Sequence, residues 1–297
     1  NVIGNEDVKD YLRKSIEANN ILHSYLFLGT DGIGKLLVAK EFAKYILCSE
    51  NGKDNCNCKS CVCYDGSNHP DYTIINENGE TIKIEQIRNL VEKIIEKPII
   101  SNRKVYIIND SDKMTKEAQN CLLKTLEEPP EFVTIILISS NENLLLNTIR
   151  SRCMKIKFKN IENKILYDYA IQKIGYDEIS DNLLKTFEGS IGKAIILKEN
   201  KENYSEIEAL ISKMKTDDII SIFLNSKFMY NKEKIFEILD YLIVCLYSKA
   251  KEDKRYLNCL KYVNESITRL KVNGNLDMNI DSLLFNIWEE LNEKSDR

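Results

Sequence analysis

The chain has 297 residues, more than one hydrophobic core of ordinary size holds, so its length predicts two or three domains. It is 43% hydrophobic and 30% charged, with 11 Gly and 4 Pro, a composition typical of a folded protein without long linkers. The formal net charge of -4 gives no overall sign of nucleic-acid or membrane binding. Any contact with DNA would therefore have to be local.

The sequence predicts no membrane span and no secretion signal. Its longest apolar runs, at 133–139 and 241–247, are far shorter than the roughly 20 residues that cross a bilayer. The first 15 residues carry acids where a signal peptide has its apolar centre. We expect a cytoplasmic protein.

Between residues 24 and 158, short apolar runs alternate with helical patterns. Fully apolar strands that alternate with helices indicate an α/β domain whose parallel sheet is covered on both faces. The pattern predicts strands at 24–29, 72–76, 104–109 and 133–139, and helices at 33–47, 84–97 and 115–128.

Beyond residue 160 the sequence predicts helices only. We expect an α/β domain at 1–160 with an insertion at 48–69, a small helical domain at 161–203, and a larger helical domain at 204–297. The sequence shows no internal repeat and no segment of low complexity.

The stretch GTDGIGKL follows a predicted strand and begins a predicted helix, which is the context of a phosphate-binding loop. Gly29, Gly32, Gly34 and Lys35 lie in the G-x-x-x-x-G-K-[ST] pattern, but Leu36 stands where the hydroxyl residue is expected. Backbone N–H groups and a lysine bind phosphate in such loops. Phosphate binding at Lys35 therefore stays open.

Hydrolysis also needs magnesium, which is held by the loop hydroxyl and by an Asp at the end of a neighbouring strand. Leu36 has no oxygen, and Asn109 stands where that Asp is expected, followed by Asp110 at the place of the water-orienting acid. These residues predict a phosphate loop that does not hydrolyse ATP. The alternative is an active ATPase in which Asp110 and Asp112 hold the metal.

Four motifs, HSYLFLGTDGIGK, LLKTLEEPP, ISSN and IRSRC, occur in this order. With their spacing they resemble the delta-prime subunits of bacterial DNA polymerase III clamp loaders, which are AAA+ proteins. The resemblance covers the α/β and small helical domains, and the last domain matches in length and helicity. Sister ATPase subunits have an intact phosphate loop and an Arg in the turn of the small domain, where Gly192 stands here. Leu36, Asn109 and Gly192 together give the delta-prime pattern.

The resemblance implies an AAA+ domain, a helical lid and a C-terminal helical collar. It implies a non-hydrolysing subunit of an assembly with DNA-directed DNA polymerase (nucleotidyltransferase) activity. The partners would be ATPase subunits and a delta subunit in a pentameric ring, with the sliding clamp and primer-template DNA bound through the complex. Arg152 of the SRC motif would act as an arginine finger on the ATP site of a partner. The alternative is a surface Arg at a helix C-terminus.

Five of the nine cysteines lie between Cys48 and Cys63, and such clustering in a cytosolic chain indicates a metal site. Cys58 and Cys61 form a C-x-x-C pair that is typical of zinc sites. Cys48 and Cys56 complete a four-cysteine site, as in the family's zinc module at this position. Only one residue separates Cys56 from Cys58 where two are expected, so Cys63 is an alternative ligand.

A structural zinc site is favoured over a catalytic one, because no carboxylate or histidine lies among the ligands. The alternative is a zinc-dependent nucleic-acid-binding module. The nearly balanced local charge, Lys53 and Lys59 against Glu50, Asp54 and Asp65, argues against this alternative.

Several other polar residues have structural interpretations. His69 precedes a strand and is predicted to be structural, while Ser139–Asn141 form either a polar sensor or a helix cap. The acids Glu127 and Glu128 at a helix end are predicted to be solvated or interface residues. Core positions in apolar helical stripes are predicted for Cys121, Cys245 and Cys259.

Overall fold

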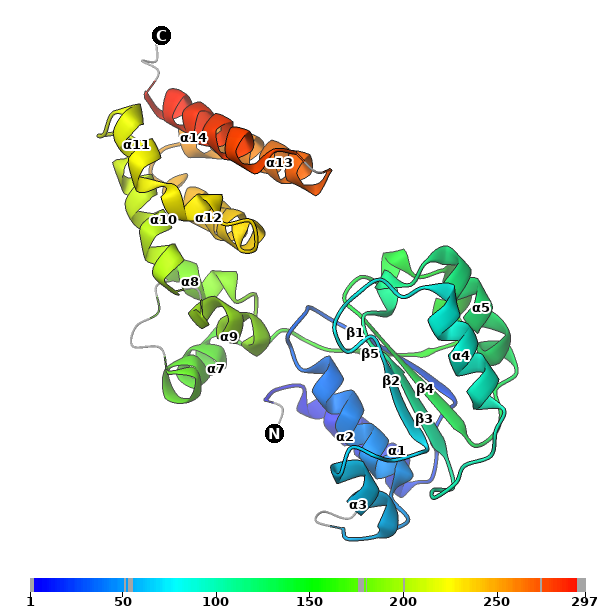
Figure 1. The fold of residues 1–297 in the computed structure, drawn as a ribbon. Coiled ribbons are helices and arrows are strands. Elements are labelled where there is room, and N and C mark those ends of the chain that lie inside the picture. Colours follow the sequence, from blue (N-terminus) through cyan, green and yellow to red (C-terminus); the bar gives the residue numbers. More distant parts are fainter. Residues whose placement is uncertain are drawn as a thin grey trace. The chain divides into compact units, whose positions relative to one another are not determined.

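The computed structural model divides the chain into two compact units, which are described separately (Figure 1). The first unit is Asn1–Glu162 with Gly189–Gly192, and the second is Asn163–Glu188 with Lys193–Arg297. The structure describes residues 3–50, 52, 56–175, 179, 181–199, 201–272 and 274–292.

The first unit is built on a parallel sheet of five strands in the order β2-β3-β4-β1-β5. Every residue of β1, β3 and β4 is buried, as expected for apolar strands that are covered on both faces. All four strands predicted from the sequence are present, and the predicted α/β fold is confirmed. The strands are β1 (Ser24–Leu28), β2 (Tyr72–Ile75), β3 (Lys104–Ile108), β4 (Val133–Ser139) and β5 (Met154–Lys157).

The fifth strand, β5, was not predicted. It pairs only with β1 and lies at the edge of the sheet, where Ile156 is its single buried residue. Two of its other residues, Lys155 and Lys157, are exposed. An edge strand with exposed lysines lacks the continuous apolar run by which the other strands were recognised.

Helices cover both faces of this sheet (Figure 1). Alternate residues of β1 point to opposite faces, so that Tyr25 and Phe27 pack in the core cluster with α1 and α2, whereas Leu26 packs in the cluster with α4 and α5. The predicted helices correspond to α2, α4 and α5, while α1, α3 and α6 were not predicted. The helices of this unit are α1 (Glu6–Glu17), α2 (Lys35–Leu47), α3 (Lys59–Asp65), α4 (Ile84–Ile94), α5 (Lys116–Glu127) and α6 (Asn147–Arg150).

The described residues of the second unit form helices and connecting turns, with no strand among them. Its core includes the rings of Tyr204 and Tyr241, which are tilted by 43° with centroids 4.2 Å apart. The indole N–H of Trp288 in the last helix, α14, donates to the carbonyl of Asp217, in the turn before α11. The division at residue 203 stays a prediction. The helices are α7 (Asn163–Tyr169), α8 (Asp181–Thr186), α9 (Ile191–Glu199), α10 (Lys201–Lys213), α11 (Ile219–Asn225), α12 (Ile235–Lys249), α13 (Arg255–Lys271) and α14 (Leu276–Asn292).

The cysteines outside the cluster agree with their predicted core positions. Cys245 and Cys259 are buried in the second unit, and Cys121 is partly buried against the core beside α5. Burial raises the pKa of the Cys245 and Cys259 thiols to about 12. Within the described residues, no helix is long and apolar enough to cross a membrane.

Candidate functional site

The phosphate loop lies where its sequence predicts, between β1 and α2 at the carboxyl end of the sheet. Gly34 immediately precedes α2 and has a φ of 96°, and Gly32 has a φ of 74°. Both values lie in the left-handed region, which glycine enters at little cost. Glycine at these two positions therefore suits the turn between β1 and α2.

Lys35 is directed back onto its own loop. Its Nζ donates hydrogen bonds to the carbonyls of Gly29 at 2.6 Å and Thr30 at 2.9 Å, and it lies 3.6 Å from the carboxylate of Asp31. The residue is only 6% exposed, and this burial lowers the pKa of its ammonium group, against the opposing effect of Asp31. The ammonium group that would bind a phosphate thus already has two carbonyls and one carboxylate of its own loop as partners.

Leu36 and Asn109, which stand where the sequence led us to expect magnesium ligands, both make structural contacts. Leu36 packs against the core beside α2. The side-chain amide of Asn109 donates to the carbonyl of Asn76 at 3.3 Å, and the amide of Asn76 donates to the carbonyl of Asn109 at 3.3 Å. This reciprocal pair joins the ends of β2 and β3, so Asn109 has a structural role here.

Each of the two acids that could replace these ligands has one oxygen in contact with another side chain, while Oδ1 of Asp112 is buried without a hydrogen-bond partner. Asp110 lies 3.0 Å from the ammonium group of Lys113, and Asp112 accepts a hydrogen bond from Ser140 at 3.2 Å. A metal at this site would have to compete with the Lys113 charge.

Gly192, where the family resemblance led us to expect an arginine in an ATPase, contacts the loop between β1 and α2 directly through its backbone. Its N–H donates a hydrogen bond to the carbonyl of Gly32 at 2.9 Å. A Cβ at this position would lie 2.6 Å from the Cα of Gly32, closer than carbon atoms approach without a shift of the backbone. Only glycine fits this contact, and the turn at 189–192 therefore packs onto the loop.

The polar stretch after β4 forms a cap. Asn141 precedes the short turn η2 (Glu142–Leu144), and its side chain accepts a hydrogen bond from the N–H of Asn143 at 3.1 Å. The hydroxyl of Ser139 accepts from the N–H of Asn141 at 3.1 Å and is fully buried. The capping interpretation describes the observed contacts, and the sensor role stays a prediction.

Four cysteines of the insertion come together as a candidate metal centre. The sulfur atoms of Cys48, Cys56, Cys58 and Cys61 all lie within 4.8 Å of one another, and those of Cys48 and Cys58 are 4.0 Å apart. Four thiolates at about 2.3 Å from a tetrahedral zinc ion would be separated by about 3.8 Å. The cluster thus fits zinc if the sulfur–sulfur distances shorten slightly. Cys63 is not one of the four clustered cysteines.

The local fold explains how these ligands converge. Cys48 ends α2, and Cys58 precedes α3, where its sulfur accepts a hydrogen bond from the N–H of Cys61 at 3.4 Å. Burial alone would raise the pKa of Cys58, but hydrogen bonds from Ser49 and Cys61 lower it to about 6. A thiolate at this position is available to a metal near neutral pH.

A buried network beside the cluster anchors the insertion to the sheet. His69 lies 2.8 Å from the hydroxyl of Ser60 through Nε2, and its Nδ1 accepts the N–H of Asp71 at 3.1 Å. The hydroxyls of Ser60 and Ser101 both donate to the carbonyl of Leu47, at 2.7 and 2.9 Å. The predicted structural role of His69 agrees with these contacts. These residues form no catalytic triad, because Nδ1 of His69 accepts a hydrogen bond and has no proton to donate to the Asp71 carboxylate. That carboxylate instead accepts the backbone N–H groups of residues 99–101.

Arg152 follows α6 and is partly exposed, with 32% of its side-chain surface accessible. Its NH2 lies 2.6 Å from the carboxylate of Glu127 at the end of α5, and its NH1 donates to the carbonyl of Thr148 at 2.8 Å. The second contact is that of an arginine at a helix C-terminus. The ion pair with Glu127 was not predicted, because no sequence pattern indicates that the end of α5 lies beside Arg152.

Comparison with known proteins identifies the family. Residues 4–162 match the family described as DNA polymerase III, delta subunit. The chain belongs to this family. Over 208 residues it is 35% identical to the DNA polymerase III subunit delta' of Bacillus subtilis (strain 168), an alignment that covers 70% of this chain and 63% of that protein. The predicted resemblance to delta-prime subunits is confirmed.

Other relatives carry the names of tau and gamma subunits. The chain is 31% identical over 204 residues to the DNA polymerase III subunit tau/gamma of Haemophilus influenzae, covering 66% of this chain and 30% of that protein. A DNA polymerase III gamma subunit-related protein from Thermotoga maritima has the same fold, with a TM-score of 0.54 and 20% identity over 96% of this chain and all of that one. The chain thus spans less than two thirds of the length of these sequence relatives.

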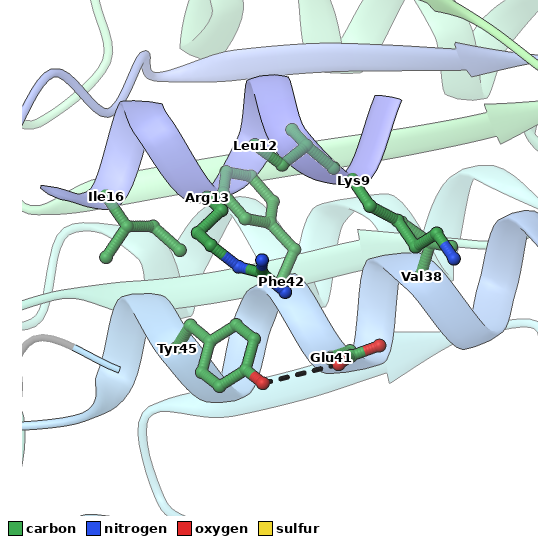
Figure 2. A pocket seen from close by; sticks show the side chains of 8 residues that line it. All are labelled: Lys9, Leu12, Arg13, Ile16, Val38, Glu41, Phe42 and Tyr45. Atoms are coloured by element: carbon green, nitrogen blue, oxygen red, sulfur yellow. Dashed lines mark hydrogen bonds between the residues drawn. The ribbon is translucent and has the colours of Figure 1, made fainter. Parts of the chain in front are cut away.

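A small pocket between α1 and α2 contains none of the phosphate-loop residues (Figure 2). Its volume of about 40 Å³ is near that of one or two water molecules. The hydroxyl of Tyr45 donates to Glu41 at 3.3 Å at its rim, as Figure 2 shows. The pocket is too small for a nucleotide, and its lining consists of Lys9, Leu12, Arg13, Ile16, Val38, Glu41, Phe42 and Tyr45.

Proposed function

We propose that this chain is a clamp-loader subunit of DNA polymerase III that assembles with ATPase subunits without hydrolysing ATP itself. The contact of Lys35 with Gly29 and Thr30 carries this proposal. The ammonium group that would bind a phosphate instead donates hydrogen bonds to two carbonyls of its own loop. Leu36 and Asn109 support it, since both are occupied in packing or in backbone hydrogen bonds.

The turn at Gly192 supports the same conclusion. An arginine at this position in an ATPase would help to stabilise the charge on the phosphates. Here the backbone of Gly192 occupies space beside Gly32 that leaves no room for any side chain. The same loop therefore contacts Gly192 through Gly32 and is bound by the ammonium group of Lys35.

The proposed contribution to ATP hydrolysis is made in trans. Arg152 is held at the surface of the first unit and would donate its guanidinium to the ATP site of a neighbouring ATPase subunit. A planar guanidinium supplied across an interface stabilises charge in the transition state and makes hydrolysis depend on correct assembly.

The remaining parts of the chain have supporting roles in this proposal. The cysteine cluster holds one structural zinc ion, and the helices at 161–203 and 204–297 serve as the lid and as the collar that closes one end of a pentameric ring. A delta subunit, the sliding clamp and primer-template DNA are bound through that ring. Loading of the clamp during replication is the function that this assembly would perform.

Two measurements on the purified chain test the proposal. A magnesium-dependent ATPase assay should show no turnover above background, and a Lys35→Ala variant should give the same rate. Turnover that disappears with Lys35→Ala would instead identify an active ATPase. A pull-down with the partner ATPase subunit should recover a stable complex, and failure to form it would remove the clamp-loader assignment.

A further inference from the structure

The ion pair between Glu127 and Arg152 connects two segments that are separated by 24 residues in the sequence. Glu127 is the last residue of α5, and Arg152 lies just after α6. Their charged groups are 2.6 Å apart, although the side chains are 47% and 32% exposed. A partly exposed pair of this kind contributes little to stability.

The backbone on the Arg152 side is already fixed. The N–H of Arg152 donates to the carbonyl of Ile149 at 3.1 Å, and its carbonyl accepts from the hydroxyl of Ser24 at 2.7 Å. The next residue, Cys153, is buried and leads directly into β5. The Cα of Arg152 is therefore held by the sheet, and only the long side chain remains to be oriented.

Three acceptors restrict that side chain. Glu127 accepts from NH2, while the carbonyl of Thr148 and the hydroxyl of Ser151 accept from NH1 at 2.8 and 3.4 Å. Free arginine side chains have many rotamers, and the loss of this freedom opposes any contact made in trans. A guanidinium that is already oriented by its own chain loses less freedom when a partner binds it.

We propose that Glu127 is a positioning residue for Arg152, orienting the guanidinium before the partner's nucleotide arrives. This inference rests on the proposed trans role of Arg152. Glu127 makes no contact with the partner's nucleotide in this scheme and acts only through Arg152. One N–H of NH2 and the N–H of Nε remain to be offered to phosphate oxygens, because a planar guanidinium carries five donors.

The test uses the reconstituted clamp loader with the partner ATPase subunits. Glu127→Ala should lower the kcat of ATP turnover roughly 3- to 10-fold with little change in KM, the size expected for two coupled neighbours. Glu127→Gln keeps an acceptor oxygen and should retain more turnover than Glu127→Ala. Glu128→Ala is the matched control: it removes the same charge one residue away, and Glu128 forms no ion pair with any described residue.

The deciding measurement is the double variant. If Glu127 acts through Arg152, then Glu127→Ala should cause no further loss when Arg152→Ala is already present. An equal further loss would identify a merely structural role and overturn the inference. The inference is also overturned if Glu127→Ala raises turnover, or if Glu128→Ala lowers it as much.

The two proposals fail in different ways. If Arg152→Ala lowers turnover but Glu127→Ala leaves it unchanged, the positioning role is wrong and the trans role stands. If Arg152→Ala has no effect in the assembled complex, the trans role is wrong and the positioning role falls with it. Melting temperatures of the single variants, which should stay close to that of the parent, exclude misfolding as the cause.

Discussion

The N–H of Gly192 donates a hydrogen bond to the carbonyl of Gly32, and the Cβ that glycine lacks would lie 2.6 Å from the Cα of Gly32. The second residue of α9 is thereby packed against the phosphate loop, backbone to backbone. This contact predicts that any side chain at position 192 lowers the free energy of unfolding.

Gly192→Ala should destabilise the protein by about 1–3 kcal/mol, because the added methyl group has no room beside Gly32. Helix propensity alone predicts the opposite, a gain of about 1 kcal/mol for alanine over glycine. Denaturant unfolding of the two proteins measures the difference. A more stable Gly192→Ala protein would show that the contact with the loop does not persist in solution.

One zinc ion per chain is expected from metal analysis, and the cluster of four cysteines identifies the ligands. Cys58→Ser and Cys61→Ser should each lose the bound zinc, because an alcohol is a much poorer zinc ligand than a thiolate. Cys63→Ser is the matched control, since Cys63 lies on the same helix but outside the cluster. Loss of zinc from Cys63→Ser with retention in Cys61→Ser would exclude this ligand set.

Stability should fall on acidification through the buried His69. Burial lowers the pKa of this imidazole in the folded protein, against the opposing effect of Asp71, so the unfolded state binds the proton more readily. The stability is fully present above the unfolded pKa of about 6.5 and decreases as the pH falls below it, until the lower folded pKa is reached.

His69→Gln should be less stable than the parent at pH 8 but should lose less stability between pH 7 and 5.5. The exposed His23, the other of the two histidines, gives the control: His23→Gln should keep the pH dependence of the parent. Zinc is kept in excess, so that protonation of the cysteines affects all three proteins alike. Equal pH profiles for the parent and His69→Gln would contradict this prediction.

Arg152→Ala should leave folding and subunit association nearly unchanged, since a partly exposed ion pair contributes at most about 1 kcal/mol. The ATP turnover of the assembled complex should fall roughly 10-fold or more, as for other trans-acting arginine fingers. Arg152→Lys should restore little, because an ammonium group lacks the planar pair of donors. Arg150→Ala, two residues earlier in the same motif, should retain turnover. If Arg150→Ala and Arg152→Ala lowered ATP turnover equally, the effect would come from a change in the local structure of the motif and not from an arginine finger.

The fold was largely predictable because its central strands are continuous apolar runs. The residues of β1, β3 and β4 are all buried, and a sequence shows that pattern directly. The edge strand β5 was missed, since one buried residue, Ile156, among exposed neighbours gives no periodic signal. Helix α3 was also missed, because its seven residues carry two cysteines that the sequence assigns to a metal site.

The candidate site was predictable at the level of residue identity. Leu36, Asn109 and Gly192 were recognised as departures from an ATPase, and the four ligand cysteines were chosen from five. Spacing alone could not exclude Cys63, since that choice depends on how α3 turns its side chains. The contact of Gly192 with Gly32 and the pairing of Glu127 with Arg152 depend on tertiary packing between distant segments, for which the sequence carries no local pattern.

The anchoring of the cysteine-containing insertion has a consequence for the diversity of this family. Ser60, inside the insertion, bonds the carbonyl of Leu47, where the insertion leaves α2, and the ring of His69, where it returns toward β2. The two ends of the insertion are held close together by these hydrogen bonds. The conformational entropy lost on closing it therefore depends little on its length. Relatives could therefore shorten, exchange or discard the cysteine-containing insertion without rebuilding the sheet, and a chimaeric chain with a short bridge in its place should still form the five strands.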